Sequence, residues 1–168
     1  MNKDGLEIER RFLIQMPDIE WLEHAAEHTE ITQTYLARPA PGVTARVRKR
    51  GLDGSYVYTH TEKTRLSDMS RREIERQITA EEYTDLLGKA DRSRRVIQKT
   101  RYCLPYRGQT FEIDVFPFWQ RMAIMEIELE SEGQSVLFPP QIVLLREVTS
   151  DRRYTNASLA KCIPEEEI

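Results

Sequence analysis

Cysteine, histidine and long apolar stretches are all scarce in this chain. Its 168 residues include 2 cysteines and 3 histidines, namely Cys103, Cys162, His24, His28 and His60. Two cysteines cannot build a disulfide framework, and the residues between His24 and His28 do not form a zinc-protease motif. No stretch is apolar enough to cross a membrane, and residues 1–10 lack the apolar core of a signal peptide. We therefore expect a cytoplasmic protein without a histidine metal site.

An excess of positive charge is also absent. The chain has 25 Lys and Arg against 28 Asp and Glu, which gives a formal net charge of −3. A general nucleic-acid-binding protein is normally basic, so this balance argues against that class, although a basic pocket remains compatible with it. No linker divides the sequence, and its length suits one domain over residues 1–168.

Alternation of apolar and polar residues with period two dominates the chain and predicts β-strands. It occurs in eight segments, 6–14, 32–37, 43–50, 56–63, 72–78, 96–104, 110–116 and 123–130. Helices are expected over 18–28, from Thr79 onward, where Thr79 and Glu82 have capping-box spacing, and near 157–162. Tight turns are expected at 39–42 and 51–54. We predict a mainly β fold with peripheral helices, in which eight antiparallel strands close a barrel.

Several of these strands carry charges of one sign at alternate positions. The acidic sets are Glu7 and Glu9, Glu73 and Glu75, Glu112 and Asp114, and Glu126, Glu128 and Glu130; the basic sets are Arg46 and Arg48, and Lys99 and Arg101. Side chains at i and i+2 stand on one face, roughly 6.5–7 Å apart. One interpretation is a half-solvated sheet with charges facing water. The other places the charges inside a barrel, with the intervening Ile and Leu outside under the helices. Like charges on neighbouring positions repel, which favours a bound ligand.

The two kinds of charge predict two kinds of ligand. Clustered carboxylates without Cys or His suit a hard divalent cation such as Mg²⁺ or Mn²⁺. Clustered Arg and Lys suit phosphate oxygens. A phosphate chain bridged by metal to carboxylates and gripped by cations satisfies both sets.

The order of these motifs resembles the CYTH domain family, also called triphosphate tunnel metalloenzymes. Residues 7–11 (EIERR) resemble its opening ExExK signature, and residues 46–48 (RVR) its RxR strand. The TxK and ExE strands follow at 61–63 and 73–75, and the resemblance extends over about residues 6–160. It implies an eight-stranded antiparallel barrel whose charged tunnel binds a triphosphate with a divalent metal.

Site residues follow from the resemblance, position by position. The implied metal ligands are Glu7, Glu9, Asp114, Glu126 and Glu128. The implied phosphate-binding residues are Arg11, Arg46, Arg48, Lys63, Lys99 and Arg101, and the supporting carboxylates are Glu73, Glu75, Glu112 and Glu130.

Arg11 and Lys63 occupy the catalytic positions, and Arg11 departs from the signature lysine. Arginine stays protonated and cannot act as a base, whereas it can still bind phosphate. Lys63, or a carboxylate acting through water, is then the better candidate for handling the proton.

The resemblance to short bacterial members implies a metal-dependent tripolyphosphatase that hydrolyses inorganic triphosphate and needs neither nucleic acid nor membrane. Nucleoside triphosphatase, thiamine triphosphatase, class IV adenylate cyclase and a non-catalytic triphosphate- or polyphosphate-binding module remain alternatives. The sequence also leaves three questions undecided: whether the protein forms a homodimer, which metal it prefers, and whether the tunnel is open at one end or at both. Two basic runs, 92–95 and 152–153, are either solvated or placed at a tunnel mouth.

Overall fold

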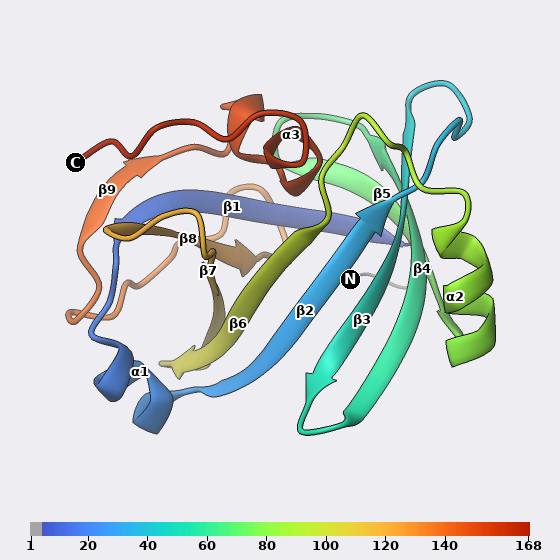
Figure 1. Cartoon of the computed structure of the whole chain (residues 1–168). Coiled ribbons are helices and arrows are strands. Elements are labelled where there is room, and N and C mark those ends of the chain that lie inside the picture. The colour runs from blue at the N-terminus through green and yellow to red at the C-terminus, as the bar shows by residue number, and fades with distance from the viewer. Residues whose placement is uncertain (1–4) are drawn as a thin grey trace.

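A computed structural model describes residues 5–168, which form nine strands, most of them wrapped into a curved sheet, and a few short helices (Figure 1). The strands are β1 (Leu6–Gln15), β2 (Glu27–Tyr35), β3 (Val43–Leu52), β4 (Ser55–Arg65), β5 (Ser70–Ile78), β6 (Ile97–Tyr106), β7 (Gln109–Val115), β8 (Met122–Glu128) and β9 (Leu144–Glu147). The helices are α1 (Ile19–Ala25), α2 (Ala80–Leu87), the 3-10 turn η1 (Arg152–Tyr154) and α3 (Asn156–Leu159). No helix in this part of the chain is long and apolar enough to span a membrane.

Eight of the strands close an antiparallel barrel, as predicted. The strand order is β5-β4-β3-β2-β6-β7-β8-β1, and pairing of β1 with β5, at Leu6 opposite Arg72, closes the ring. The short β9 was not predicted; it adds to β1 beside the barrel wall. Closure matters for function because it turns one face of every strand toward a shared interior.

Local sequence signals explain the tight connections. β3 and β4 are joined by Asp53 and Gly54, whose φ angles are 50° and 82°. Two positive φ values in a two-residue loop define the hairpin turn whose twist matches that of the strands, and Asp-Gly is a preferred pair for it. The predicted turn is therefore confirmed. The predicted capping box is also present, because Thr79 and Glu82 bond each other's backbone N–H at the start of α2.

Two predicted boundaries near the N-terminus are wrong. The helix expected over 18–28 ends at Ala25, and β2 begins at Glu27 rather than at residue 32. Ala26 is already extended, with φ −137° and ψ 147°. Residues 27–33 pair with β6 from Cys103 to Ile97, so ladder hydrogen bonds override the weak helical pattern there.

The apolar residues form an outer layer and an inner plug. The outer layer buries Ile8, Ile113 and Ile127 against α1 and the segment after β8, as the barrel interpretation predicted. The prediction is wrong for Ile74, which is 62% exposed because no helix covers that part of β5. The inner plug fills one part of the barrel with side chains from the strands and from the C-terminal segment, among them Leu13, Ile97, Ile124, Trp119, Tyr154 and Leu159.

Candidate active site

The rest of the interior is a charged cavity of about 440 Å³. Its lining comes from the inward faces of all eight barrel strands, β1 to β8, together with connecting loops and the C-terminal segment. Glu7, Arg48, Lys63 and Glu128 all line it, so the interpretation with charges inside the barrel is confirmed. Strand alternation explains the arrangement, since each of these strands presents every second side chain to the interior.

Strand register brings like charges together on the acidic side of the cavity. Glu9 on β1 lies directly opposite Glu128 on β8, and Glu126 on β8 lies directly opposite Glu112 on β7. Directly opposed like charges destabilise a sheet. Burial and the charge of Glu126 raise the pKa of Glu9 to about 7. The acidic side is therefore electrostatically strained unless positive charge neutralises it.

Arg11 supplies part of that positive charge. Its Nη2 donates to Glu9 Oε1 at 2.5 Å, and its Nε donates to Glu126 Oε1 at 3.4 Å. Burial alone would raise the pKa of Glu126, but Arg11 and Arg101 hold that pKa well below its ordinary value. The planar guanidinium thus directs separate N–H groups at the carboxylates of Glu9 and Glu126. A lysine ammonium at this position would contact the same carboxylates with less directional hydrogen bonds.

Lys63 and Arg71 bridge β4 and β5 to β1. Lys63 Nζ lies 2.9 Å from both Glu7 Oε2 and Glu73 Oε2. Arg71 Nη1 lies 2.9 Å from Glu9 Oε1, and its Nε lies 3.7 Å from Glu7 Oε2. Lys63 is therefore held between two carboxylates at the wall of the cavity.

A second ion cluster lies inside the barrel, beside the cavity and against the inner plug, where Lys99 lies over the Phe116 ring. Lys99 Nζ donates to Asp114 Oδ2 at 2.6 Å, and Arg101 donates to both oxygens of Asp114 at 2.7 and 2.8 Å. Asp114 and Lys99 side chains are fully buried, and Asn156 accepts a second hydrogen bond from Lys99 at 3.1 Å. Burial and the nearby Arg101 lower the pKa of Lys99 to about 7. Both oxygens of Asp114 are thus occupied by protein cations.

Arg46 and Arg48 on β3 differ from the other buried cations. Among residues 5–168 neither forms an ion pair, and Arg46 Nε is buried without a hydrogen-bond partner. Arg48 donates from Nε and Nη2 to the fully buried Gln33 amide oxygen, at 3.2 and 3.0 Å. Burial and the charges of Arg46 and Arg101 lower the pKa of Arg48 to about 9. These two guanidiniums face the cavity without a carboxylate in direct contact.

Most of the sequence-predicted site residues meet in this cavity, and three do not. The cavity is lined by Glu7, Glu9, Arg11, Arg46, Arg48, Lys63, Glu73, Glu75, Arg101, Glu112, Glu126 and Glu128. Asp114 and Lys99 are buried beside the cavity without lining it, and Glu130 is exposed beyond the end of β8. The ligand roles of all these residues stay predictions.

Several lining residues were not named in advance. Arg71 shares the inner face of β5 with Glu73 and Glu75, so the same period-two signal could have found it. Gln33, which does not line the cavity but holds Arg48, shares a face of β2 with the lining residue Tyr35. The lining residues of the C-terminal segment, such as Asn156, lie outside any strand, and periodicity holds no signal for them.

The carboxylate set fits a hard divalent cation by its chemistry. Its donors are all oxygens, two acidic pairs stand directly opposed, and burial beside Glu126 raises the pKa of Glu9. In residues 5–168 no three Asp, Glu, His or Cys side chains form a group that could hold a metal ion, because the carboxylates are turned toward arginine and lysine. Metal binding would accordingly exchange some of these protein cations for the ion.

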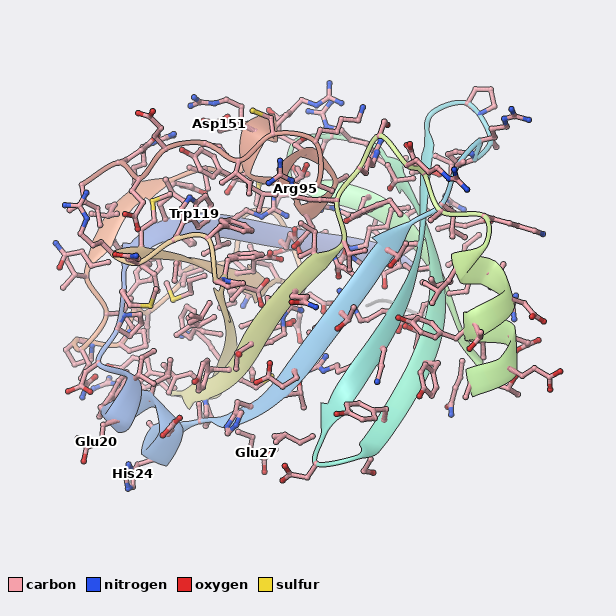
Figure 2. All side chains as sticks on the ribbon, viewed as in Figure 1. Glu20, His24, Glu27, Arg95, Trp119 and Asp151 are labelled. Atoms are coloured by element: carbon pink, nitrogen blue, oxygen red, sulfur yellow. The ribbon has the colours of Figure 1, made fainter. Side chains whose placement is uncertain are left out.

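The histidines take no part in the cavity. Figure 2 shows His24 on α1 at the edge of the molecule, where its Nδ1 lies 2.7 Å from the backbone oxygen of Glu20. The His28 ring packs against Tyr102 at 5.3 Å between centroids.

Comparison with known proteins decides the family. A model of the CYTH domain matches residues 5–155. The chain belongs to the CYTH domain family. This CYTH protein is 38% identical over 162 residues to the inorganic triphosphatase of Nitrosomonas europaea, and the alignment covers 94% of this chain and 99% of the relative. It is 32% identical over 93 residues to the inorganic triphosphatase of Acetivibrio thermocellus, which covers 55% of this chain and 58% of that relative.

Solved structures agree with the barrel. The crystal structure of an inorganic triphosphatase aligns with this CYTH protein at a TM-score of 0.61 and 33% identity, over 95% of this chain and 97% of the other. A protein from Hippeastrum, whose structure is described as that of a "putative adenylyl cyclase" with a dominant triphosphatase activity, aligns at a TM-score of 0.52 and 16% identity over 74% of this chain and 80% of the other, which shows a shared fold.

Proposed function

We propose that this CYTH protein is a divalent-metal-dependent enzyme that hydrolyses inorganic triphosphate inside the barrel. The observation that carries the proposal is the division of charge in one cavity. Arg46 and Arg48 face it without carboxylate partners, while opposed glutamates stand on β1, β7 and β8. A polyanion bound with a cation neutralises both sides at once. The 38% identity to an inorganic triphosphatase over nearly the whole chain supports the same substrate.

The protein's own residues bind and orient the chain of phosphates. Arg46 and Arg48 would grip phosphate oxygens with forked hydrogen bonds, with Gln33 fixing the plane of Arg48. Arg11 and Arg101 would add positive charge at the acidic side. Phosphoryl transfer depends mainly on positioning and charge neutralisation, so these residues suit the reaction.

Glu7, Glu9, Glu126 and Glu128 would hold Mg²⁺ or Mn²⁺. The bound metal would supply Lewis-acid stabilisation of charge on the phosphoryl oxygens. In the hydrolysis, a water oxygen attacks a terminal phosphorus, the bond to the bridging oxygen breaks, and orthophosphate and pyrophosphate leave.

Lys63 is the proposed residue for orienting that water. Its ammonium, which is held between Glu7 and Glu73 at 2.9 Å each, would donate a hydrogen bond to the water oxygen, and the neighbouring Glu73 carboxylate would accept the proton that the attacking water loses. Arg11 stays charged and serves in binding.

The test is a product panel on the purified chain with triphosphate, ATP and thiamine triphosphate in Mg²⁺ or Mn²⁺. Phosphate and pyrophosphate from triphosphate are the expected products. Release of pyrophosphate and cyclic AMP from ATP would instead identify the protein as a cyclase. Faster hydrolysis of ATP or thiamine triphosphate than of triphosphate would assign a different substrate. Tight binding of triphosphate without any product would identify a binding module.

Glu9→Gln should abolish metal-dependent turnover and leave the fold intact, because the amide keeps the shape and loses the charge. Glu147→Gln is the matched control, since Glu147 pairs with Arg10 at 2.8 Å outside the cavity. Full activity of Glu9→Gln would remove the metal assignment.

A further inference from the structure

Arg71 lies at the seam where β5 and β1 close the barrel. It is directly opposite Glu7 in that ladder, and the register beside it is fixed because the Glu73 N–H donates to the Gly5 carbonyl oxygen at 2.8 Å. Its side chain lines the cavity and is 16% exposed. The seam therefore directs a guanidinium from β5 toward the acidic strand β1.

The Arg71 guanidinium spans two of the carboxylates that are proposed to hold metal. Its Nη1 lies 2.9 Å from Glu9 Oε1, and its Nε lies 3.7 Å from Glu7 Oε2. Within residues 5–168 these are its only ion pairs. A divalent cation bound by Glu7 and Glu9 would compete with Arg71 for the same oxygens, and it would leave the guanidinium without a carboxylate.

Arg71 is the cation that a metal can displace most readily. Lys63 has a second carboxylate outside the proposed metal ligands, because Glu73 Oε2 lies 2.9 Å from its Nζ. Arg11 shares Glu9 Oε1 with Arg71, at 2.5 Å from its Nη2, but only 4% of the Arg11 side chain is exposed. Arg71 therefore lacks both the second partner that holds Lys63 and the dense packing that holds Arg11.

A displaced Arg71 would face another cation on its other side. There β5 pairs with β4, and Arg65 lies directly opposite Arg71. Both side chains line the cavity, and directly opposed like charges destabilise a sheet. Arg65 also uses the nearby carboxylate, because it pairs with Asp68. The guanidinium that a metal releases is thus left beside positive charge, where a phosphate oxygen is a suitable acceptor.

We propose that Arg71 is an internal counter-ion, which neutralises Glu7 and Glu9 when no metal is bound and which the metal displaces toward a phosphate of the substrate. The inference rests on the proposed function, because it assigns one more residue to the same site. Without substrate, Arg71 opposes metal binding, since its ion pairs must be broken first. With substrate, the released guanidinium gains a phosphate partner, so metal and substrate favour each other's binding.

The experiment measures Mg²⁺ affinity by calorimetric titration without any phosphate, at about pH 8.5, where Glu9 is ionised. Arg71→Gln removes the competing charge, so its Mg²⁺ affinity should exceed that of the wild type by about tenfold. The Tm in EDTA should instead fall by about 2–4 °C, because two carboxylates lose a partner. Arg71→Lys keeps the charge and should return both values toward those of the wild type.

Arg72→Gln is the matched control. Arg72 adjoins Arg71 on β5, but it is exposed and does not line the cavity. The control should therefore change neither the Mg²⁺ affinity nor the Tm in EDTA.

A purely structural role for Arg71 predicts a different result. Arg71→Gln would then have a lower Tm together with equal or weaker Mg²⁺ binding, and this outcome would overturn the counter-ion. The phosphate contact is tested in saturating Mg²⁺, where the KM of Arg71→Gln for triphosphate should rise about fivefold, with a smaller effect on kcat. An unchanged KM would also overturn the proposal, because displaced Arg71 would then have no phosphate partner.

Metal titration without phosphate separates this inference from the proposed function. If Arg71→Gln gains Mg²⁺ affinity while the wild type hydrolyses ATP in place of triphosphate, the counter-ion is supported and the triphosphatase proposal fails. If the wild type hydrolyses triphosphate and Arg71→Gln gains no Mg²⁺ affinity, the counter-ion alone fails. Absence of Mg²⁺ binding in both proteins would overturn both.

Discussion

Replacement of Asp114 by asparagine tests whether this carboxylate stabilises the barrel or holds metal. In the structure its two oxygens accept from Lys99 and from Arg101, and its side chain is fully buried. Asp114→Asn keeps the size and removes the charge that offsets both cations. Breaking a buried ion pair by removing one partner costs about 3–5 kcal/mol.

The expected loss lies at the low end of that range. Burial and Arg101 already lower the pKa of Lys99 to about 7, so the lysine can release its proton instead of staying charged without a partner. A loss of about 3 kcal/mol corresponds to a fall in Tm of about 6–12 °C for a domain of this size. The assay is thermal unfolding followed by circular dichroism, with EDTA present so that no metal contributes.

Glu147→Gln is the control for this measurement. Glu147 pairs with Arg10 on the surface, where its side chain is 42% exposed, so its loss should cost less than about 1 kcal/mol. The reasoning is refuted if Asp114→Asn melts within about 2 °C of the wild type in EDTA. An unchanged Tm in EDTA together with lost stabilisation by Mg²⁺ would favour the metal-ligand role that the family resemblance implies.

Two further predictions concern Gln33 and Glu9. Gln33→Leu should lower the free energy of unfolding by about 1.5–3 kcal/mol, because it removes the only described acceptor of the buried Arg48 guanidinium. Gln33→Glu keeps an acceptor and should therefore recover the lost stability. If denaturant unfolding finds Gln33→Leu as stable as the wild type, Gln33 does not stabilise the protein through Arg48. The metal-free protein should lose stability as pH rises from about 5 to about 7, since the pKa of Glu9 is about 7 when folded against 4.5 when unfolded, and the folded state therefore keeps a proton that the unfolded chain has released. The lowered pKa of Lys99 acts only above about pH 7 and in the opposite direction. In Glu9→Gln the Tm should depend less on pH across this window than in the wild type. An unchanged dependence of Tm on pH would show that Glu9 is not the group responsible.

Period-two alternation determined the strands and the face on which each charge lies. A strand side chain can point to only two sides, so Glu7, Arg48, Lys63 and Glu128 were predictable as neighbours inside a closed barrel. The Asp53-Gly54 hairpin and the Thr79 capping box were also predictable from the sequence, because the local backbone geometry of a tight turn or a helix start selects those residues.

The depth of each side chain and its partners were decided by the tertiary structure. Alternation assigns Glu112 and Asp114 to one face, but only register and packing place Glu112 at the cavity and Asp114 buried beside it. The length of β2 depends on pairing with β6, and Arg94, Arg152 and Lys161 are brought to the cavity by irregular segments without a periodic signal. Local patterns fix the direction of a side chain, whereas its distance from a residue far away in the chain depends on how the whole barrel closes.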